Sequence, residues 1–253
     1  ELGKTVSPVH GLRGDVKKTL QKLLPLLHKV SHPDWQAQID EMLVQEQAGL
    51  DSRESMTPRN VITTLNRFLG ENTPVATDVG QHQMWAAQYL NLKTSRRFLS
   101  SGGLGTMGFG MGAAIGAALG CGERSVLVTG DGSFGMNLNE LATAVANQIP
   151  MVILLLDNNV LGMVRQWQTL FFDKHYSNTN LDARKTDFVK LAEAFGAEGS
   201  RALTIPELEA ALAKAFSWNG PYLIDCAIDR DEFVLPMLPP GGSMDDIITR
   251  IGD

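Results

Sequence analysis

The sequence predicts an α/β fold in which helices cover both faces of a parallel sheet, the doubly wound arrangement. The first observation is a pair of continuously apolar segments, SVLVTG (125–130) and MVILLLD (151–157), which are typical of strands buried on both faces. The second is that segments with helical periodicity alternate with such strands, as parallel neighbours require. The third is a composition of 43% hydrophobic and 20% charged residues, which is typical of a folded chain and excludes disorder.

The first 56 residues are predicted to lie outside this domain. Asp15 is placed to cap a helix, and one apolar stripe follows it, formed by Val16, Leu20, Leu23, Leu24 and Leu27. We interpret residues 1–30 as the end of another unit, and the start at Glu1 instead of an initiator methionine suggests a processed or truncated piece of something longer. Residues 31–56 are polar and charged, which favours a linker, and residues 57–253 form the main domain with a C-terminal arm.

From Thr57 onward, helices and strands are expected to alternate. Thr57 and Pro58 begin a helix that Gly70 ends, and Thr204 with Glu207 forms a capping box for a helix that runs to about 217. The other expected elements are a strand at 74–78, a helix near 81–90, a glycine-rich helix, strands at 125–130 and 151–157, helices near 136–147 and 187–195, and a strand at 221–229. Ligands bind at the carboxyl ends of such strands, which are Asp78, Gly130 and Asp157.

Charge, glycine and cysteine content exclude several classes of function. The net charge of −6 gives no electrostatic footprint for nucleic acid or an anionic membrane. Residues 98–122 are uncharged and repeat glycine at the spacing of packed transmembrane helices, but their nine glycines leave too little apolar surface for a span. We instead expect a helix with a face free of side chains, which lets a backbone or ligand come close. Cys121 and Cys226 form no CxxC pair, which favours a reducing cytoplasm.

An aspartate inside a glycine turn is the strongest chemical signal. The pattern G-x-G-x-x-G occurs at 103–108 and at 130–135, and the second copy follows a strand and contains Asp131. A dinucleotide site would use Asp157 for the ribose, but it would also place Asp131 against a pyrophosphate. Two unit charges about 4 Å apart repel by roughly 4 kcal/mol at an effective dielectric of about 20. The helix dipole offsets only about 0.3–1 kcal/mol of this repulsion, so a divalent cation must bridge the Asp131 carboxylate and the pyrophosphate.

Further oxygen ligands for such a cation follow the next strand. Asn158 lies just beyond that strand, on the same rim of the sheet, and the carbonyl of Val160 could add a third protein oxygen. One carboxylate, one amide, one carbonyl, two phosphate oxygens and a water make the octahedral set that Mg²⁺ prefers. The alternative is that Asp131 merely caps a helix beginning near Gly135, which leaves the asparagines unexplained.

These motifs also carry a family resemblance. Gly130-Asp131-Gly132, then 25 residues, then Asn158-Asn159 is similar to the signature of thiamine diphosphate enzymes. The flanking segments are VGQHQMWAAQ (79–88), SSGGLGTMGFG (100–110), GDGSFGMNLNELATAVANQ (130–148) and LGMVRQWQTLFF (161–172). Together they resemble the catalytic subunit of acetohydroxyacid synthases, also called acetolactate synthases, densely over residues 57–253. Residues 1–30 look like the tail of that family's central domain, which would be truncated in this chain. The fold that this resemblance implies is the domain that binds the cofactor's diphosphate.

The resemblance implies a role for each matching residue. Asp131, Asn158 and the Val160 carbonyl would hold Mg²⁺. Residues that would contact the cofactor are Gly80, Gln81, His82, Gly105, Met107, Gly132, Ser133, Gly162 and Met163, with Met107 wedging it into a bent conformation. Met163, Val164 and Trp167 would line the pocket of the second substrate, and the arm at 233–242 would fold over the entrance. The bland alternatives are that Met107 fills the core and that Trp167 is a buried anchor.

The sequence departs from the family pattern in two places. Asp157 stands where the family usually has the first asparagine, so the pair is shifted by one. Asn158 remains the expected ligand because LGMVRQW then aligns without a gap, and Asn159 is the alternative. Gly112 replaces a usual proline.

The implied activity is condensation of pyruvate with pyruvate or 2-ketobutyrate, giving 2-acetolactate or 2-aceto-2-hydroxybutyrate for branched-chain amino acid biosynthesis. The family's activating glutamate belongs to an N-terminal domain of a neighbouring subunit, and FAD contacts mainly other domains. We therefore expect no catalytic residue in this chain, no turnover by it alone, an oligomer that includes the N-terminal part, and a possible regulatory subunit. The alternatives are another thiamine diphosphate-dependent decarboxylase or oxidase, an NAD-binding domain, and a non-catalytic Mg²⁺-nucleotide sensor.

Overall fold

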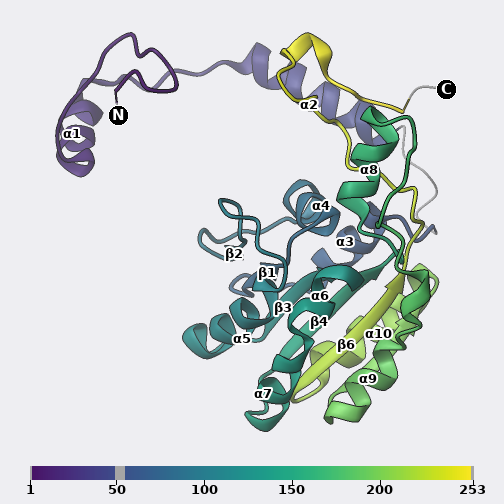
Figure 1. Cartoon of the computed structure of the whole chain (residues 1–253). Coiled ribbons are helices and arrows are strands. Elements are labelled where there is room, and N and C mark those ends of the chain that lie inside the picture. The colour runs from purple at the N-terminus through teal and green to yellow at the C-terminus, as the bar shows by residue number, and fades with distance from the viewer. Residues whose placement is uncertain (1, 49–54, 252–253) are drawn as a thin grey trace. The chain divides into compact units, whose positions relative to one another are not determined.

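The computed structural model describes residues 2–48 and 55–251, except for the side chains of 45–48 (Figure 1). The chain divides into two compact units, residues 1–51 and residues 52–253. The first unit contains α1 (Val16–Leu23), a 3-10 turn at Leu24–Leu26 and α2 (Pro33–Ala48). Asp15 caps α1 as predicted, since its carboxylate accepts a hydrogen bond from the backbone N–H of Lys18 at 2.9 Å.

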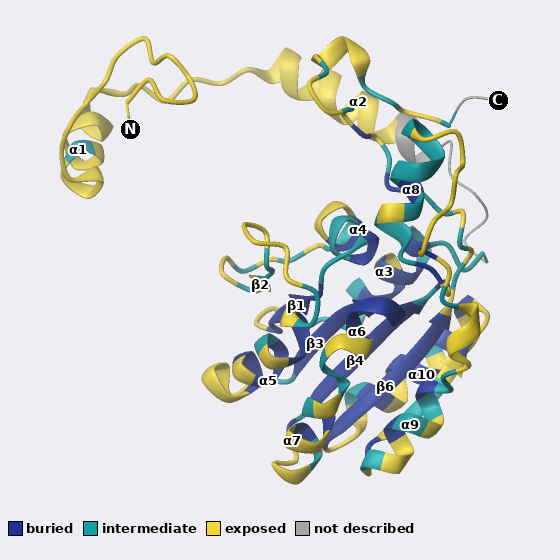
Figure 2. Ribbon diagram, in the orientation of Figure 1, coloured by how far each residue is buried: buried dark blue, intermediate teal, exposed yellow. Residues whose placement is uncertain are grey.

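The apolar stripe predicted for the first unit is only partly helical. The α-helix ends at Leu23, because a 3-10 turn containing Pro25 follows it, and Leu27 is already extended. No residue of α1 is buried, and the unit is coloured as exposed over most of its length in Figure 2. Among the described residues, we therefore find no hydrophobic packing that would stabilise this stripe.

Within residues 55–251 the structure forms one parallel sheet, with strand order β2-β1-β3-β4-β6-β5. The strands are β1 (Val75–Thr77), β2 (Phe98–Leu99), β3 (Ser125–Gly130), β4 (Met151–Asp157), β5 (Glu198–Ala202) and β6 (Pro221–Ala227). The predicted parallel sheet is confirmed. Two edge strands, β2 and β5, were not predicted, because β2 is only two residues long and β5 is the mostly exposed segment EGSRA.

Helices cover both faces of this sheet, as the doubly wound prediction requires (Figure 1). The helices are α3 (Pro58–Asn66), α4 (Gln81–Tyr89), α5 (Phe109–Cys121), α6 (Asp131–Asn137), α7 (Leu141–Ala146), α8 (Gly162–Phe171), α9 (Phe188–Phe195) and α10 (Ile205–Ser217), with 3-10 turns at Leu138–Glu140, Asp182–Arg184 and Met244–Asp246. Side chains of successive strand residues point to opposite faces of the sheet and pack into two separate hydrophobic cores. Val152 and Leu154 pack with α3, α4 and α10, whereas Ile153 and Leu155 pack with α5, α7 and α9.

Two predicted helices have other boundaries in the structure. The helix begun by Thr57 ends at Asn66, before Gly70, although Phe68 and Leu69 still pack on the core. The helix expected near 136–147 is instead α6, a 3-10 turn and α7, and α6 begins at Asp131 itself. Asp131 therefore does not cap a helix that starts near Gly135, because it already occupies the first turn of α6.

The glycine-rich segment forms α5, and its glycines act differently from the expectation. A Cβ at Gly110 would lie 2.6 Å from Leu127 Cδ1 and 2.9 Å from the Asp78 nitrogen, so the close backbone approach occurs there. Gly112, Gly116 and Gly120, on the spacing that we singled out, have nothing within 4 Å of such a Cβ. In the part of the chain that the structure describes, no helix combines the length and apolarity needed to cross a bilayer.

Candidate functional site

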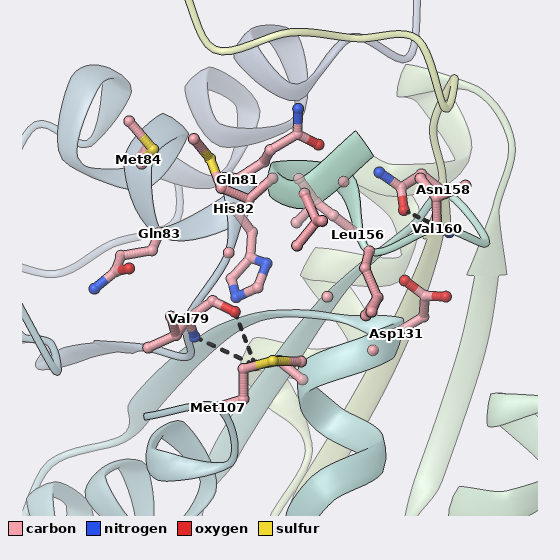
Figure 3. A pocket seen from close by; sticks show the side chains of 18 of the residues that line it. Val79, Gln81, His82, Gln83, Met84, Met107, Asp131, Leu156, Asn158 and Val160 are labelled. Carbon is pink, nitrogen blue, oxygen red and sulfur yellow. Dashed lines mark hydrogen bonds between the residues drawn. The ribbon is translucent and has the colours of Figure 1, made fainter. Parts of the chain in front are cut away.

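A cavity of about 310 Å³ lies where β1, β3 and β4 end, at the edge of the sheet that the strand pattern indicates (Figure 3). It is lined by thirteen of the predicted site residues: Gly80, Gln81, His82, Gly105, Met107, Asp131, Gly132, Ser133, Asn158, Val160, Gly162, Met163 and Val164. Trp167 lines a neighbouring cavity instead. Sequence reasoning assigned no role to six further lining residues, Val79, Gln83, Met84, Trp85, Leu156 and Leu161. All but Leu156 lie in the family segments 79–88 and 161–172, where the motif signalled the segment but not the individual residue.

Asp131 is the charged group of this cavity. Its side chain begins α6 directly after β3, is 1% exposed, and lies 2.9 Å from a guanidinium nitrogen of Arg184. The pKa of Asp131 is raised to about 7, chiefly by burial and secondly by the charge of Asp157, while Arg184 opposes both effects. A carboxylate in this position needs a cation beside it, because a buried charge is stable only when it is paired or coordinates a metal.

Asn158 and Val160 supply oxygens beside Asp131. The Asn158 amide oxygen accepts a hydrogen bond from the Val160 N–H at 3.1 Å, which leaves one of its two lone pairs for another partner. In Figure 3 the Asp131 carboxylate points toward the side of the cavity formed by these two residues. Asn159, the alternative ligand, is exposed, has a φ of 57° and does not line the cavity.

The donor set distinguishes between kinds of metal site. Across residues 2–48 and 55–251, no three histidine, cysteine, aspartate or glutamate residues are grouped so that they could hold a metal ion. A cation at Asp131 would therefore have one carboxylate and neutral oxygens from the protein, and it would need further oxygens from a ligand. This arrangement suits Mg²⁺, which binds through one or two carboxylates plus substrate phosphates.

Asp78 organises the loop that carries Gly105 and Met107, a role that sequence reasoning missed. Its Oδ1 accepts hydrogen bonds from the N–H groups of Val79 at 3.0 Å and Gly108 at 2.7 Å. Gly108 has a φ of 91° and Gly105 a φ of 66°, conformations that glycine adopts without strain. The sequence did show an aspartate at the end of a strand. We used Asp78 only to locate the site and predicted no hydrogen bond for its side chain.

Met107 and Ser133 both line the cavity, and Gly132 lies close to the Met107 side chain. A Cβ at Gly132 would lie 2.7 Å from Leu161 Cδ2 and 3.8 Å from Met107 Cε, so a larger residue would force the Leu161 side chain to move. Met107 is half-buried and belongs to neither hydrophobic core, which contradicts the core-filling alternative. The Ser133 hydroxyl donates to the Val79 carbonyl at 2.9 Å, so it holds the loop after β1.

The wall formed by α4 is polar but uncharged. Burial lowers the pKa of His82 to about 3, against a weaker opposing effect of a hydrogen bond with the Asp78 backbone, so the imidazole is neutral. A Cβ at Gly130 would lie 2.8 Å from His82 Nδ1, so this glycine makes room for the ring. Among the described residues, His82 Nε2 and Gln81 Oε1 are buried polar atoms without a hydrogen-bond partner. Both residues line the cavity, which indicates that a polar ligand supplies the missing hydrogen-bond partners of these two atoms.

A second cavity of about 800 Å³ adjoins the first along α8. Met163 and Val164 line both cavities, whereas Trp167, Phe171 and Phe172 line only the second. Trp167 is half-buried and packs edge-on against Phe171 with ring centroids 5.3 Å apart, so it is not a fully buried anchor. The three predicted substrate residues thus share one helix face that joins the two cavities.

The C-terminal arm contacts two of the helices that carry cavity residues. Side chains of α4 and α8 donate hydrogen bonds to backbone carbonyls of residues 232–235. Of the described residues that form the cavity wall, none comes from 233–242. The segment therefore braces α4 and α8, and the expectation that residues 233–242 fold over the entrance stays a prediction.

Comparison with known proteins decides the family. Residues 78–226 match the family described as "Thiamine pyrophosphate enzyme, C-terminal TPP binding domain". The chain belongs to this family. The match runs from Asp78 to β6, so it contains every residue that lines the first cavity. The resemblance noted from GDG and the asparagines is thereby confirmed.

Relatives of this thiamine pyrophosphate domain are named acetolactate synthases. It is 38% identical to "Acetolactate synthase 1, chloroplastic" of Nicotiana tabacum, covering 99% of this chain and 40% of that protein. It is 41% identical to "Probable acetolactate synthase large subunit" of Methanocaldococcus jannaschii, covering 99% and 44%. It is 40% identical to "Acetolactate synthase isozyme 2 large subunit" of Escherichia coli, covering 99% and 45%. The chain thus spans less than half the length of these relatives.

Proposed function

We propose that this chain forms the thiamine diphosphate- and magnesium-binding half of an acetolactate synthase. The reaction is condensation of pyruvate with pyruvate or 2-ketobutyrate to 2-acetolactate or 2-aceto-2-hydroxybutyrate, in branched-chain amino acid biosynthesis. The observation that carries the proposal is the buried Asp131 carboxylate in a cavity with two unpartnered polar atoms. The names of the relatives support the choice of reaction.

The residues present fit a magnesium diphosphate. Asp131, the Asn158 amide oxygen and the Val160 carbonyl supply hard oxygens, and the diphosphate supplies the rest. Burial raises the pKa of Asp131, and a divalent cation beside it would favour the ionised form that binds the metal. Around the diphosphate stand Gly80, Gln81, His82, Gly132, Ser133 and Gly162, all on the cavity wall. The neutral His82 adds no charge to this group.

The reacting end of the cofactor would face Gly105, Met107 and α8. When bound, thiamine diphosphate accepts the electron pair released as a 2-keto acid loses CO₂. Met107 would support the bent cofactor through its contact beside Gly132. Met163 and Val164 line both cavities, so they would direct the second 2-keto acid, and Trp167 would form the far wall of its pocket.

Another thiamine diphosphate decarboxylase or oxidase is the alternative within the family, and its products would differ. The NAD-binding and Mg²⁺-nucleotide sensor alternatives lose their support to the family match. The Asp157 carboxylate, which an NAD site would use, accepts a hydrogen bond from the Asn159 N–H at 3.2 Å.

The whole enzyme would need further parts. The relatives are more than twice as long as this chain, which supports an N-terminal portion that carries the activating glutamate and contacts FAD. Two relatives are named "large subunit", which supports a regulatory partner, and a homodimer or larger oligomer is the proposed assembly. The cysteines are free, which agrees with a cytoplasmic location.

Product analysis tests the proposed reaction. The chain alone, given pyruvate, thiamine diphosphate and Mg²⁺, should form no acetolactate, whereas co-expression with an N-terminal portion from a relative should restore it. Trp167→Leu should lower condensation more than CO₂ release, with Trp218→Leu as a control on a distant, partly exposed tryptophan. Acetaldehyde or acetate as the sole product would favour the decarboxylase or oxidase, and tight NADH binding would contradict the cofactor assignment.

A further inference from the structure

We infer that Gln166 is a positioning residue that couples docking of the arm to ligand binding in the cofactor cavity, a conclusion that rests on the proposed function. Gln166 is the one residue of α8 classed as buried, a helix described throughout, and it is 0% exposed. A fully buried amide among apolar neighbours is costly unless all its hydrogen bonds are made. The hydrogen-bond partners of Gln166 therefore indicate which segments it positions.

Gln166 uses its whole hydrogen-bonding capacity on two segments. Its Oε1 accepts from the Val234 N–H at 2.9 Å and from Gln81 Nε2 at 2.8 Å. Its Nε2 donates to the Val234 carbonyl at 2.9 Å and to Met237 Sδ at 3.4 Å. The paired bonds to the Val234 backbone fix which end of the amide faces Gln81. Gln166 thus presents only an acceptor to Gln81.

The orientation of Gln81 follows from this acceptor. Gln81 Nε2 donates both to Gln166 and to the Glu232 carbonyl at 3.0 Å, so both of its protons are used on the arm side. Its Oε1 is buried without a partner in the described structure, and Gln81 lines the cavity. The bound ligand, or water on its metal, would supply the missing donor. Without the arm, Gln81 and Gln166 would each lose bonds that hold this orientation.

The arm has two further anchors on α4. Trp85 Nε1 donates to the Phe233 carbonyl at 3.4 Å, and Gln88 Nε2 donates to the Leu235 carbonyl at 3.0 Å. Trp85 lines the cavity, whereas Gln88 is exposed and does not. The segment 232–237 therefore braces α4 and α8, the two helices that bear Gln81 and the shared wall residue Met163. Ligand binding that needs ordered helices will favour the docked arm, and linkage requires the reverse effect to be equal.

The experiment measures both directions of this coupling in the 253-residue chain. Thiamine diphosphate affinity is determined by calorimetry in saturating Mg²⁺, and arm docking by hydrogen exchange of 232–237 with and without cofactor. Gln166→Met keeps the volume and removes the amide, so we expect roughly five- to tenfold weaker binding. Cofactor-dependent protection of the arm should fall by the same factor. Gln168→Met is the matched control, because this amide of the same helix bonds to Ser177 and Thr179 and not to the arm.

A milder variant covers the case in which Gln166→Met fails to fold. Gln88→Met removes an exposed arm anchor outside the cavity and should weaken cofactor binding about two- to threefold. Unchanged affinity in both variants, or a loosened arm with unchanged affinity, would overturn the coupling alone. Failure of the unmodified chain to bind thiamine diphosphate with Mg²⁺ would overturn the proposed function and the coupling with it.

Discussion

The two walls of the cofactor cavity differ in how their buried polar groups are stabilised. The rim at the ends of β3 and β4 carries a buried carboxylate, Asp131, and a guanidinium beside it. The wall formed by α4, α8 and the arm buries neutral amides and a histidine that burial keeps uncharged. The rim depends on a counter-cation, whereas the amide wall depends on complete hydrogen bonding. Loss of a cation should therefore cost more than loss of one amide bond.

The neutrality of His82 should appear as a pH dependence of stability. Its pKa is about 3 in the folded chain and about 6.5 when exposed, so the unfolded chain alone binds this proton between those values. Stability is therefore lost as pH falls below 6.5, by about 2 kcal/mol at pH 4.5. Denaturant unfolding at both pH values measures this loss, and His82→Gln should show a correspondingly smaller one. Equal losses in the two proteins would contradict a neutral, buried His82.

Gly162 lies between the two walls, so a methyl group there should disturb both. A Cβ at Gly162 would overlap Gln81 Oε1 and lie 3.0 Å from Asn158 Nδ2. We expect Gly162→Ala to weaken thiamine diphosphate binding about tenfold, within the usual cost of overpacking. Gly112→Ala is the control, because its Cβ would meet nothing within 4 Å. Calorimetry that finds the two variants equal would contradict the packed arrangement of Gln81 and Asn158.

Arg184 and a metal ion would both bind the Asp131 carboxylate. Removal of Arg184 should therefore lower the stability of the metal-free chain but raise its affinity for Mg²⁺. Arg184→Gln should lower the stability of the metal-free chain by about 1 kcal/mol or more, since it leaves the buried Asp131 carboxylate without its counter-charge. It should also strengthen Mg²⁺ binding a few-fold by removing a competing cation. Arg230→Gln, which breaks an exposed pair with Asp182, should do neither. Weaker Mg²⁺ binding in Arg184→Gln would show that the arginine assists the metal.

The smallest effect is expected at Asn159. Its φ of 57° suits glycine, and it is exposed, so Asn159→Gly should change Mg²⁺ affinity less than twofold. Asn158→Ala should weaken it clearly, because Asn158 is 8% exposed on the cavity wall. The same Mg²⁺ titration compares the two, and a larger loss at Asn159 would restore it as the ligand.

The rim was predictable from sequence and the amide wall was not. Asp131 and Asn158 are unusual residue types at the ends of apolar strands, so their positions follow from the parallel sheet. Gln166 lies in a helix of mixed polarity, where a glutamine normally faces solvent, but here it is buried and bonded to Gln81 and to the arm. Edge strand β5 was missed for a similar reason, since its polar residues pair with β6 through the backbone. Glycine roles also depended on packing, because Gly110 makes the contact expected of its neighbours.

The central claim is that Asp131 tolerates a diphosphate only through a divalent cation. Calorimetric titration of thiamine diphosphate into the chain and into Asp131→Asn, each with Mg²⁺ and with a chelator, tests it directly. We predict that chelation weakens binding to the unmodified chain at least ~100-fold, as a repulsion of roughly 4 kcal/mol allows. Asp131→Asn should bind weakly with Mg²⁺ and depend on it less than threefold. Binding by Asp131→Asn that equals the unmodified chain in both conditions would contradict the account.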